Sequence, residues 1–278
     1  MRYRSRRGWL AVGLGMLVLW PATAVAQTPA IPQTAPPGTT EPTTPDPTKV
    51  VPIAEPDPLE LLQKPGDEIK LSDEKLITRW AHAQATAKIR LSPLASSRMI
   101  TRLRFFTEDK LPEVYPVLGA RMDSDGKRWV NIRIPKRPNG KTGWVLDEMV
   151  GQFYIVRTLL VVNRGKLSAT LYKGGKKILS ARVGIGKSGT PTPRGQFWIR
   201  ERLKGIAGNS VYGPWAFGTS AYSNLSDWPG GGVVGIHGTN QPGLIPGRPS
   251  HGCIRMRNDK IRQLAKLMPI GTPVSIIN

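Results

Sequence analysis

The sequence predicts a mainly β protein that has two folded domains and a short helix close to its C-terminus. From residue 99 onwards, short runs rich in Val, Ile, Tyr and Trp alternate with turns that contain Gly, Pro, Asn or Asp. This pattern is typical of small sheets. With 278 residues, the chain is long enough to build two cores and still carry appendages.

The N-terminal region has the pattern of an export signal followed by a linker. A basic cluster in residues 2–7 and an apolar run in residues 9–20 precede Ala24-Val25-Ala26, whose small side chains suit a signal peptidase. We expect residues 1–26 to be a signal peptide, which places the protein in the periplasm or cell envelope. The alternative is an uncleaved membrane anchor, because residues 8–26 are just long enough to cross a lipid bilayer as a helix. Residues 27–58 are rich in Pro and Thr, which predicts a disordered linker.

Residues 59–96 are predicted to be a short helical segment. Ser72 precedes two acidic residues, and Leu76, Ile77 and Trp80 follow at helical spacing. The next region, residues 97–150, is predicted to form a small β-barrel from short strands that turn signals at 123–126 and 138–140 separate. The expected strands are 101–106, 113–118, 129–134 and 142–146.

Residues 151–278 are predicted to form a β-sandwich that ends in a helix and a final strand. An apolar strand at 153–162, a turn at Asn163–Gly165 and further strands at 166–172 and 177–183 predict an antiparallel meander. Two Gly-rich stretches are expected to be loops. Residues 184–195 would border a cleft, and residues 215–232 would form a flap over the substrate, unless their aromatic side chains are core residues under the loop. Asn258 is the expected N-cap of a helix with one apolar face, and residues 272–277 close the sheet.

Cys253 is the only cysteine, so in an exported protein it has no intramolecular disulfide partner and is a candidate reactive thiol. A thiol needs a base to attack a carbonyl, and His237 and His251 are the nearby imidazoles. In an extended segment, His251 would share a face with Cys253 about 6–7 Å away. We therefore expect His237 to be the base and His251 a supporting group.

Two alternatives to a reactive thiol stay open at this stage. A lone cysteine is often an inert buried residue. A metal site formed by His237, His251 and Cys253 would lack a fourth protein ligand, although three-ligand catalytic sites exist.

Other residues around Cys253 suit acyl transfer. Gly252 permits unusual dihedral angles before the nucleophile, so the N–H groups of Gly252 and Cys253 are expected to point at a developing oxyanion. The planar guanidinium group of Arg255 can donate two parallel hydrogen bonds to a substrate carboxylate. We also predict that Ser250 takes part in substrate binding.

Two motifs resemble a known family. His237-Gly238-Thr239-Asn240 followed by Ser250-His251-Gly252-Cys253-Ile254-Arg255 closely resembles the signature of bacterial L,D-transpeptidases of the YkuD type, and residues 186–199 resemble a second block of that family. The resemblance implies a YkuD-type catalytic domain over residues 151–278, with Cys253 as nucleophile and His237 as proton acceptor and donor. It also implies that the Gly238 carbonyl orients His237, and it implies no cofactor or metal. Many members carry Asn at the position of Arg255.

A separate resemblance concerns the upstream region. Arg128-Trp129-Val130-Asn131-Ile132 with Gly143-Trp144-Val145 resembles bacterial SH3-like domains. It implies an SH3-like barrel over residues 97–150 that binds wall peptides or positions its neighbour, and a plain spacer is the alternative.

The charge favours anionic partners. The formal net charge is +21, and residues 151–278 hold 18 Lys and Arg against 3 Asp and Glu. Nucleic acid is not expected as a partner of an exported protein without a nucleic-acid-binding motif. Peptidoglycan stem peptides, anionic wall polymers or a membrane surface are expected instead.

The function expected from the resemblance is the formation of 3-3 cross-links between peptidoglycan stem peptides through a cysteine thioester. Transfer of the acyl group to water would make the protein an L,D-carboxypeptidase, and transfer to a lipoprotein lysine would make it a wall-anchoring transpeptidase. The alternative of another class is a non-catalytic wall-binding protein. A thiol redox protein is disfavoured because the chain has no second cysteine.

Overall fold

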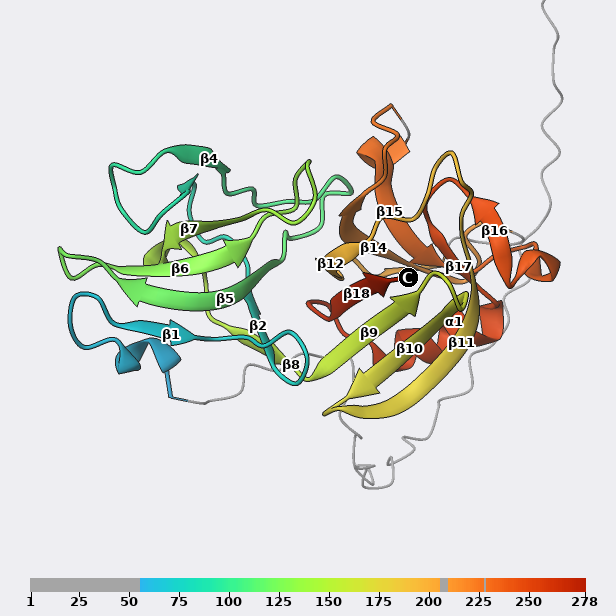
Figure 1. Cartoon of the computed structure of the whole chain (residues 1–278), viewed down its shortest axis with the longest axis horizontal. Coiled ribbons are helices and arrows are strands. Elements are labelled where there is room, and N and C mark those ends of the chain that lie inside the picture. The colour runs from blue at the N-terminus through green and yellow to red at the C-terminus, as the bar shows by residue number, and fades with distance from the viewer. Residues whose placement is uncertain (1–55, 206–209, 228) are drawn as a thin grey trace, which may run out of the picture. The chain divides into compact units, whose positions relative to one another are not determined.

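The described residues form two β-sheets and one α-helix (Figure 1). The computed structural model describes residues 56–205, 210–227 and 229–278, all of which belong to one compact unit. The predicted signal peptide and the predicted linker up to residue 55 lie outside the described residues. Within the described residues, the mainly β fold class is confirmed.

The upstream sheet consists of strands β1–β8, drawn in blue to green in Figure 1. Its strand order is β4-β3-β7-β6-β5-β2-β8, with β1 also paired to β5, and every pairing is antiparallel. Its core includes Ile89, Val117, Val130 and Ile132, none of which has exposed surface. The strands are β1 (Glu68–Lys70), β2 (Thr78–Ala81), β3 (Lys88–Arg90), β4 (Met99–Arg102), β5 (Tyr115–Met122), β6 (Arg128–Arg133), β7 (Thr142–Leu146) and β8 (Tyr154–Val156).

The prediction of a helical segment at residues 59–96 is wrong. This region contains one 3₁₀ turn, η1 (Pro58–Leu61), and strands β1, β2 and β3. The carboxylate of Asp73 does accept bonds from the N–H groups of Lys75, Leu76 and Ile77, as a helix cap would. No helix follows this cap, because Glu74 has a left-handed backbone conformation with φ 57°. The chain makes a turn there, and the residues after it form β2, which pairs with β5. Sheet pairing overrides the local helical pattern.

The predicted barrel boundaries of 97–150 are too narrow for the same reason. Strands β1–β3 precede residue 97 and β8 follows residue 150, yet all belong to the upstream sheet. The expected strand at 142–146 matches β7, and the other three expected strands are shifted by one to four residues. The single strand expected at 153–162 is divided at Arg157 into β8 of the upstream sheet and β9 of the next sheet.

The C-terminal sheet consists of strands β9–β18, in the order β12-β18-β9-β10-β11-β17-β15-β14-β13, with β16 paired to β11. The predicted meander is confirmed as β9, β10 and β11, which pair antiparallel. The strands are β9 (Thr158–Asn163), β10 (Ser168–Lys173), β11 (Lys176–Gly186), β12 (Gly195–Trp198), β13 (Leu203–Lys204), β14 (Trp215–Tyr222), β15 (Val233–His237), β16 (Gly247–Ser250), β17 (Ile254–Met256) and β18 (Pro273–Ile277); the 3₁₀ turns are η2 (Asp147–Met149), η3 (Pro229–Gly232) and η4 (Pro242–Leu244).

The C-terminal sheet curls so that its two ends meet. An isolated bridge joins Ile199, just after β12, to Thr219 in β14, and the Arg200 N–H donates to the carbonyl of Gly218. The curl encloses a core to which β9, β11, β14, β15, β17, β18 and the helix α1 (Asn258–Leu267) contribute. In the described part of the chain, no helix is long and apolar enough to cross a membrane.

Two local predictions in this sheet are wrong. The Gly- and Ser-rich stretch expected to be a loop from residue 215 is instead the buried strand β14 up to Tyr222. Gly218 serves packing there, because a Cβ at this position would collide with the Glu201 carboxylate. The N-cap of α1 is Arg257 rather than Asn258, and the side chain of Asn258 accepts a bond from the Thr239 N–H at 2.9 Å.

A buried ionic cluster links the two sheets. Arg200, which follows β12, donates to both carboxylate oxygens of Glu113 and to Glu108. Arg200 is 1% exposed and Glu113 is fully buried. Arg104 pairs with the same two glutamates, and the Tyr222 hydroxyl donates to Glu108. Burial would raise the pKa of Glu108, but Arg200, Tyr222 and Arg104 outweigh it and hold the pKa at about 2.

Replacing Arg200 with Met should strongly destabilise the protein, because Glu113 would stay buried without its main counter-charge. We expect a loss of about 3–5 kcal/mol in the free energy of unfolding, measured by urea denaturation. Arg128→Met is the control, since it breaks the more exposed pair with Asp147 and should cost about 0–1 kcal/mol. Equal losses in the two variants would contradict the importance of the buried cluster.

Candidate active site

Neighbouring parallel strands bring Cys253 and His237 to one face of the C-terminal sheet. Strand β15 pairs with β17 in the register Ile236 to Ile254 and His237 to Arg255. Ile236 and Ile254 are fully buried in the core. Because successive side chains alternate between faces of a strand, His237, Arg255 and Cys253 project from the opposite face.

Gly235 leaves the space that the thiol and the imidazole border. A Cβ placed on Gly235 would lie 3.8 Å from the Cys253 Sγ atom and 3.8 Å from the Cδ2 atom of His237. The Gly235 N–H donates to the sulfur at 3.4 Å. A Cβ at Gly235 would therefore be in van der Waals contact with both groups, so the predicted association of the only cysteine with the histidine of a distant segment is present.

His237 is held as a neutral base. Its Nδ1 atom lies 2.6 Å from the Gly238 carbonyl oxygen, and because a carbonyl only accepts, Nδ1 carries the proton and Nε2 keeps its lone pair. Burial lowers the pKa of His237 to about 4, aided by the charge of Arg255 and opposed by the Gly238 carbonyl. At neutral pH the imidazole can therefore accept a proton.

The thiol is also neutral at rest. Cys253 is partly buried, and burial raises the pKa of its thiol, although the Gly235 N–H and the charge of Arg255 act in the opposite direction. A neutral thiol beside a neutral imidazole calls for proton transfer to His237 as the sulfur attacks, rather than for a preformed thiolate.

The turn that precedes Cys253 is built by Ser250, Gly252 and Thr192. The Ser250 hydroxyl donates to the Cys253 carbonyl at 2.6 Å and accepts from the Gly252 N–H at 3.1 Å. Gly252 has φ 126°, which favours glycine. Thr192, fully buried, donates to the Gly252 carbonyl at 2.7 Å. These bonds fix the backbone next to Cys253.

These bonds change two predicted roles. Ser250 is 1% exposed and uses its hydroxyl within the turn, so it positions the backbone rather than binding substrate. The Gly252 N–H is already bonded to Ser250, which leaves the Cys253 N–H as the remaining donor of the expected oxyanion pair. Sequence analysis did not predict this role of Thr192. The position of Thr192 within residues 186–199, the second motif that resembles the family, could have indicated it.

Arg255 and His251 differ in how they relate to the site. Arg255 lies beside His237 in the paired strands. It donates to the Gln241 side chain, and its buried Nε–H has no partner among the described residues. The positive charge of Arg255 acts on the pKa of both Cys253 and His237, and a cation in this place suits the predicted carboxylate contact. His251 is exposed, and the chain bends at it instead of running extended, so the premise that it shares a face with Cys253 is wrong.

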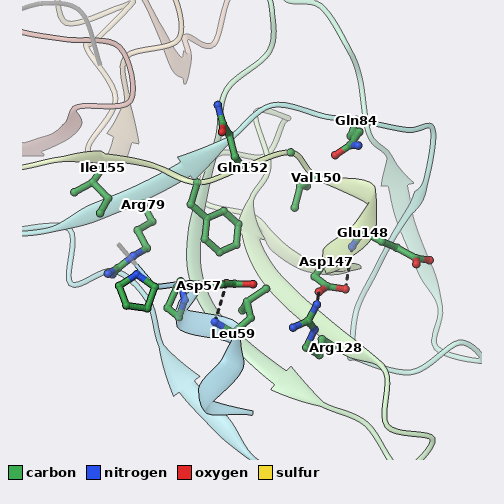
Figure 2. A pocket seen from close by; sticks show the side chains of 14 residues that line it. Asp57, Leu59, Arg79, Gln84, Arg128, Asp147, Glu148, Val150, Gln152 and Ile155 are labelled. Atoms are coloured by element: carbon green, nitrogen blue, oxygen red, sulfur yellow. Dashed lines mark hydrogen bonds and ion pairs between the residues drawn. The ribbon is translucent and has the colours of Figure 1, made fainter. Parts of the chain in front are cut away.

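No metal centre forms in the part of the chain that the structure describes, because no three His, Cys, Asp or Glu side chains gather closely enough. The three-ligand alternative for His237, His251 and Cys253 is therefore not formed. A cavity of about 520 Å³ lies on the upstream sheet (Figure 2). Figure 2 shows Arg128 pointing to Asp147 at its edge.

A segment of the upstream sheet holds one wall of the thiol site. Asn139 donates to the Tyr222 carbonyl at 2.9 Å and accepts from the Tyr222 N–H at 3.0 Å. Arg137 donates to the carbonyls of Ser223 and Leu225 at 3.0 and 3.2 Å. The Ser223 Cβ lies 3.2 Å from where a Cβ on Gly252 would sit. Residues 137–139 thus clamp the chain that packs against the turn before Cys253, a role that sequence reasoning missed.

Replacing Asn139 with Ala should slow acylation of Cys253, because the wall next to Gly252 loses both bonds to Tyr222. We expect a decrease of about 30-fold in the acylation rate constant, because two hydrogen bonds at about 1 kcal/mol each amount to about 2 kcal/mol. Intact-protein mass spectrometry over time measures it. Asn163→Ala, which removes one side-chain bond from a different turn, is the control. A full acylation rate despite a lower melting temperature would show that the clamp is only structural.

Replacing Tyr212 with Ala should raise the pKa of His237. The Tyr212 ring lies edge-on to the imidazole with the ring centroids 5.0 Å apart, and burial is the main cause of the low pKa. A protonated imidazole cannot accept a proton from the thiol. In a plot of acylation rate against pH, the fall in rate on the acidic side should therefore occur at a higher pH in the variant. Histidine NMR titration measures the pKa, with His251 as internal control. An unchanged titration of His237 would contradict this view of the site.

Comparisons with known proteins point to one family. Residues 157–276 match the YkuD family, the L,D-transpeptidase catalytic domain. YkuD of Bacillus subtilis, provisionally named an L,D-transpeptidase, is 33% identical over 44% of this chain and 68% of its own length. A Bacillus licheniformis relative of the same name is 38% identical over 38% of this chain and 57% of its own length.

A crystal structure of an Enterococcus faecium L,D-transpeptidase superposes with a TM-score of 0.35 and 24% identity, over 43% of this chain and 49% of that chain. This partial superposition is too weak to support a conclusion. The matched catalytic domain, residues 157–276, contains the thiol, the imidazole and the turn between them. The chain belongs to the L,D-transpeptidase family and carries its YkuD catalytic domain in the C-terminal sheet.

Proposed function

We propose that the protein is an exported L,D-transpeptidase that forms 3-3 cross-links between peptidoglycan stem peptides. The observation that carries this proposal is the placement of Cys253 and a neutral, carbonyl-oriented His237 next to each other around Gly235. Family membership supports the chemistry. The signal-like residues 1–26 support export, and the basic charge of the C-terminal region fits a carboxylate-bearing substrate.

The first half of the reaction forms a thioester. The Cys253 sulfur attacks the carbonyl carbon of the third residue of a tetrapeptide stem while its proton passes to Nε2 of His237. The Cys253 N–H stabilises the oxyanion, and Arg255 holds a substrate carboxylate. The bond to the terminal D-alanine then breaks, and His237 returns the proton to the leaving amine.

The second half transfers the acyl group. A side-chain amine of another stem attacks the thioester and releases its proton to His237, and the thiol of Cys253 regains that proton as it leaves. Water as acceptor would give carboxypeptidase activity, and a lipoprotein lysine would give wall anchoring. Mass spectrometry of the products distinguishes dimers from free tripeptides and from lipoprotein adducts.

We also propose that the upstream sheet is SH3-like and positions the catalytic domain. The clamp on Ser223 and Leu225 and the ionic cluster around Arg200 support the positioning role. Binding of a wall peptide in the cavity of Figure 2 is the second role. A lining that combines apolar side chains such as Leu59 and Val150 with polar ones such as Arg79 and Gln152 supports it.

Replacing Cys253 with Ala should abolish the covalent adduct and the cross-linked product, because no other cysteine can form a thioester. Intact-protein mass spectrometry after incubation with a tetrapeptide stem, or with a carbapenem as an acylating mimic, measures the adduct. An adduct or cross-linked dimers from the variant would overturn the proposal. Retained binding to isolated cell walls without any adduct in the unmodified protein would favour a wall-binding protein.

Replacing His237 with Gln should slow acylation about 100-fold or more, because the proton acceptor is lost. His251→Gln is the matched control, since it removes an exposed imidazole from the turn before Cys253. We expect that control to acylate at close to the unmodified rate. If His251→Gln is as slow as His237→Gln, a supporting role for His251 in catalysis is correct after all.

A further inference from the structure

A cavity of about 370 Å³ lies beside the Arg200 cluster and is lined by four cations. Arg102 comes from the end of β4, Arg104 follows it, and Lys136 and Arg137 belong to the segment that clamps Tyr222. The phenol-bearing side chains of Tyr115 and Tyr222 complete the wall, and no Asp or Glu is among the lining residues.

Nearby carboxylates neutralise only part of this charge. Arg104 and Arg200 face Glu108 and Glu113, so that cluster is balanced two against two. The other three lining cations, Arg102, Lys136 and Arg137, have no carboxylate partner among the described residues. Three positive charges therefore border a space that contains no protein anion, and their summed field favours the entry of an anion.

The position of Arg137 is fixed before any ligand arrives. Its guanidinium group lies 4.7 Å from the centre of the Tyr222 ring and one of its amino groups donates to the Ser223 and Leu225 carbonyls. A guanidinium carries five N–H donors, so donors remain for an oxyanion. Because its side chain is already ordered, little conformational entropy is lost on binding. Arg102 and Lys136 are exposed and can close on a ligand from the rim.

We propose that this cavity binds a multivalent oxyanion, a small ligand with two or more carboxylate or phosphate groups. The volume of about 370 Å³ falls within the usual range for small-ligand sites. Guanidinium and ammonium groups recognise both kinds of oxyanion. The site uses no atom of Cys253 or His237, so binding of an anion there does not require the reactive thiol or the imidazole.

Titration calorimetry of the full chain with pyrophosphate and, separately, with citrate tests the site. We expect saturable binding at one site with a dissociation constant below about 1 mM at low salt. Tighter binding of pyrophosphate identifies a phosphate ligand, and tighter binding of citrate identifies a carboxylate ligand. Cys253→Ala should bind as the unmodified protein does, so failure of the transpeptidase proposal would leave this result unaffected.

The double variant Arg102→Gln with Lys136→Gln should weaken binding by about tenfold or more, because two of the three uncompensated charges are removed. Lys176→Gln with Arg182→Gln is the matched control: it removes one Lys and one Arg, both exposed, from β11. That control should keep the unmodified affinity. Equal weakening in the two double variants, or no saturable binding of either ligand, would overturn the proposal.

Discussion

The parallel pairing of β15 with β17 is the constraint on which the rest of the site depends. Ile236 and Ile254 anchor these strands in the core without any exposed surface. A slip of one residue would turn these isoleucines outwards and carry the thiol or the imidazole to the other face. The hydrophobic core thereby fixes the chemistry, because the buried residues and the reactive residues alternate along the same two strands.

Burial then sets the protonation states of the reactive pair. The same environment raises the pKa of Cys253 and lowers that of His237, so both groups are uncharged at rest. A buried ion pair would cost desolvation energy, whereas a neutral pair can form charge only as the sulfur attacks. Arg255 supplies a positive charge beside both groups and is suited to an anionic substrate rather than to an internal partner.

The upstream sheet contributes to the site without supplying a reactive group. Residues 137–139 hold the chain after β14, and that chain packs on the turn at Gly252. The balanced cluster around Arg200 supports this arrangement from the other side of Tyr222. The same arrangement leaves Arg137 at the wall of an uncompensated cationic cavity. Positioning and anion binding therefore share one set of residues between β14 and the upstream sheet.

The sequence by itself determined the residue types and their spacing: a lone cysteine, its histidines, the strand and turn patterns and the apolar face of the C-terminal helix. These are local properties. Only the tertiary structure decided that residues 68–90 form strands, that Ser250 builds a turn, and that Asn139 lies against Tyr222. Strand neighbours, burial and pKa values depend on contacts between segments far apart in the chain, and no local pattern encodes such contacts.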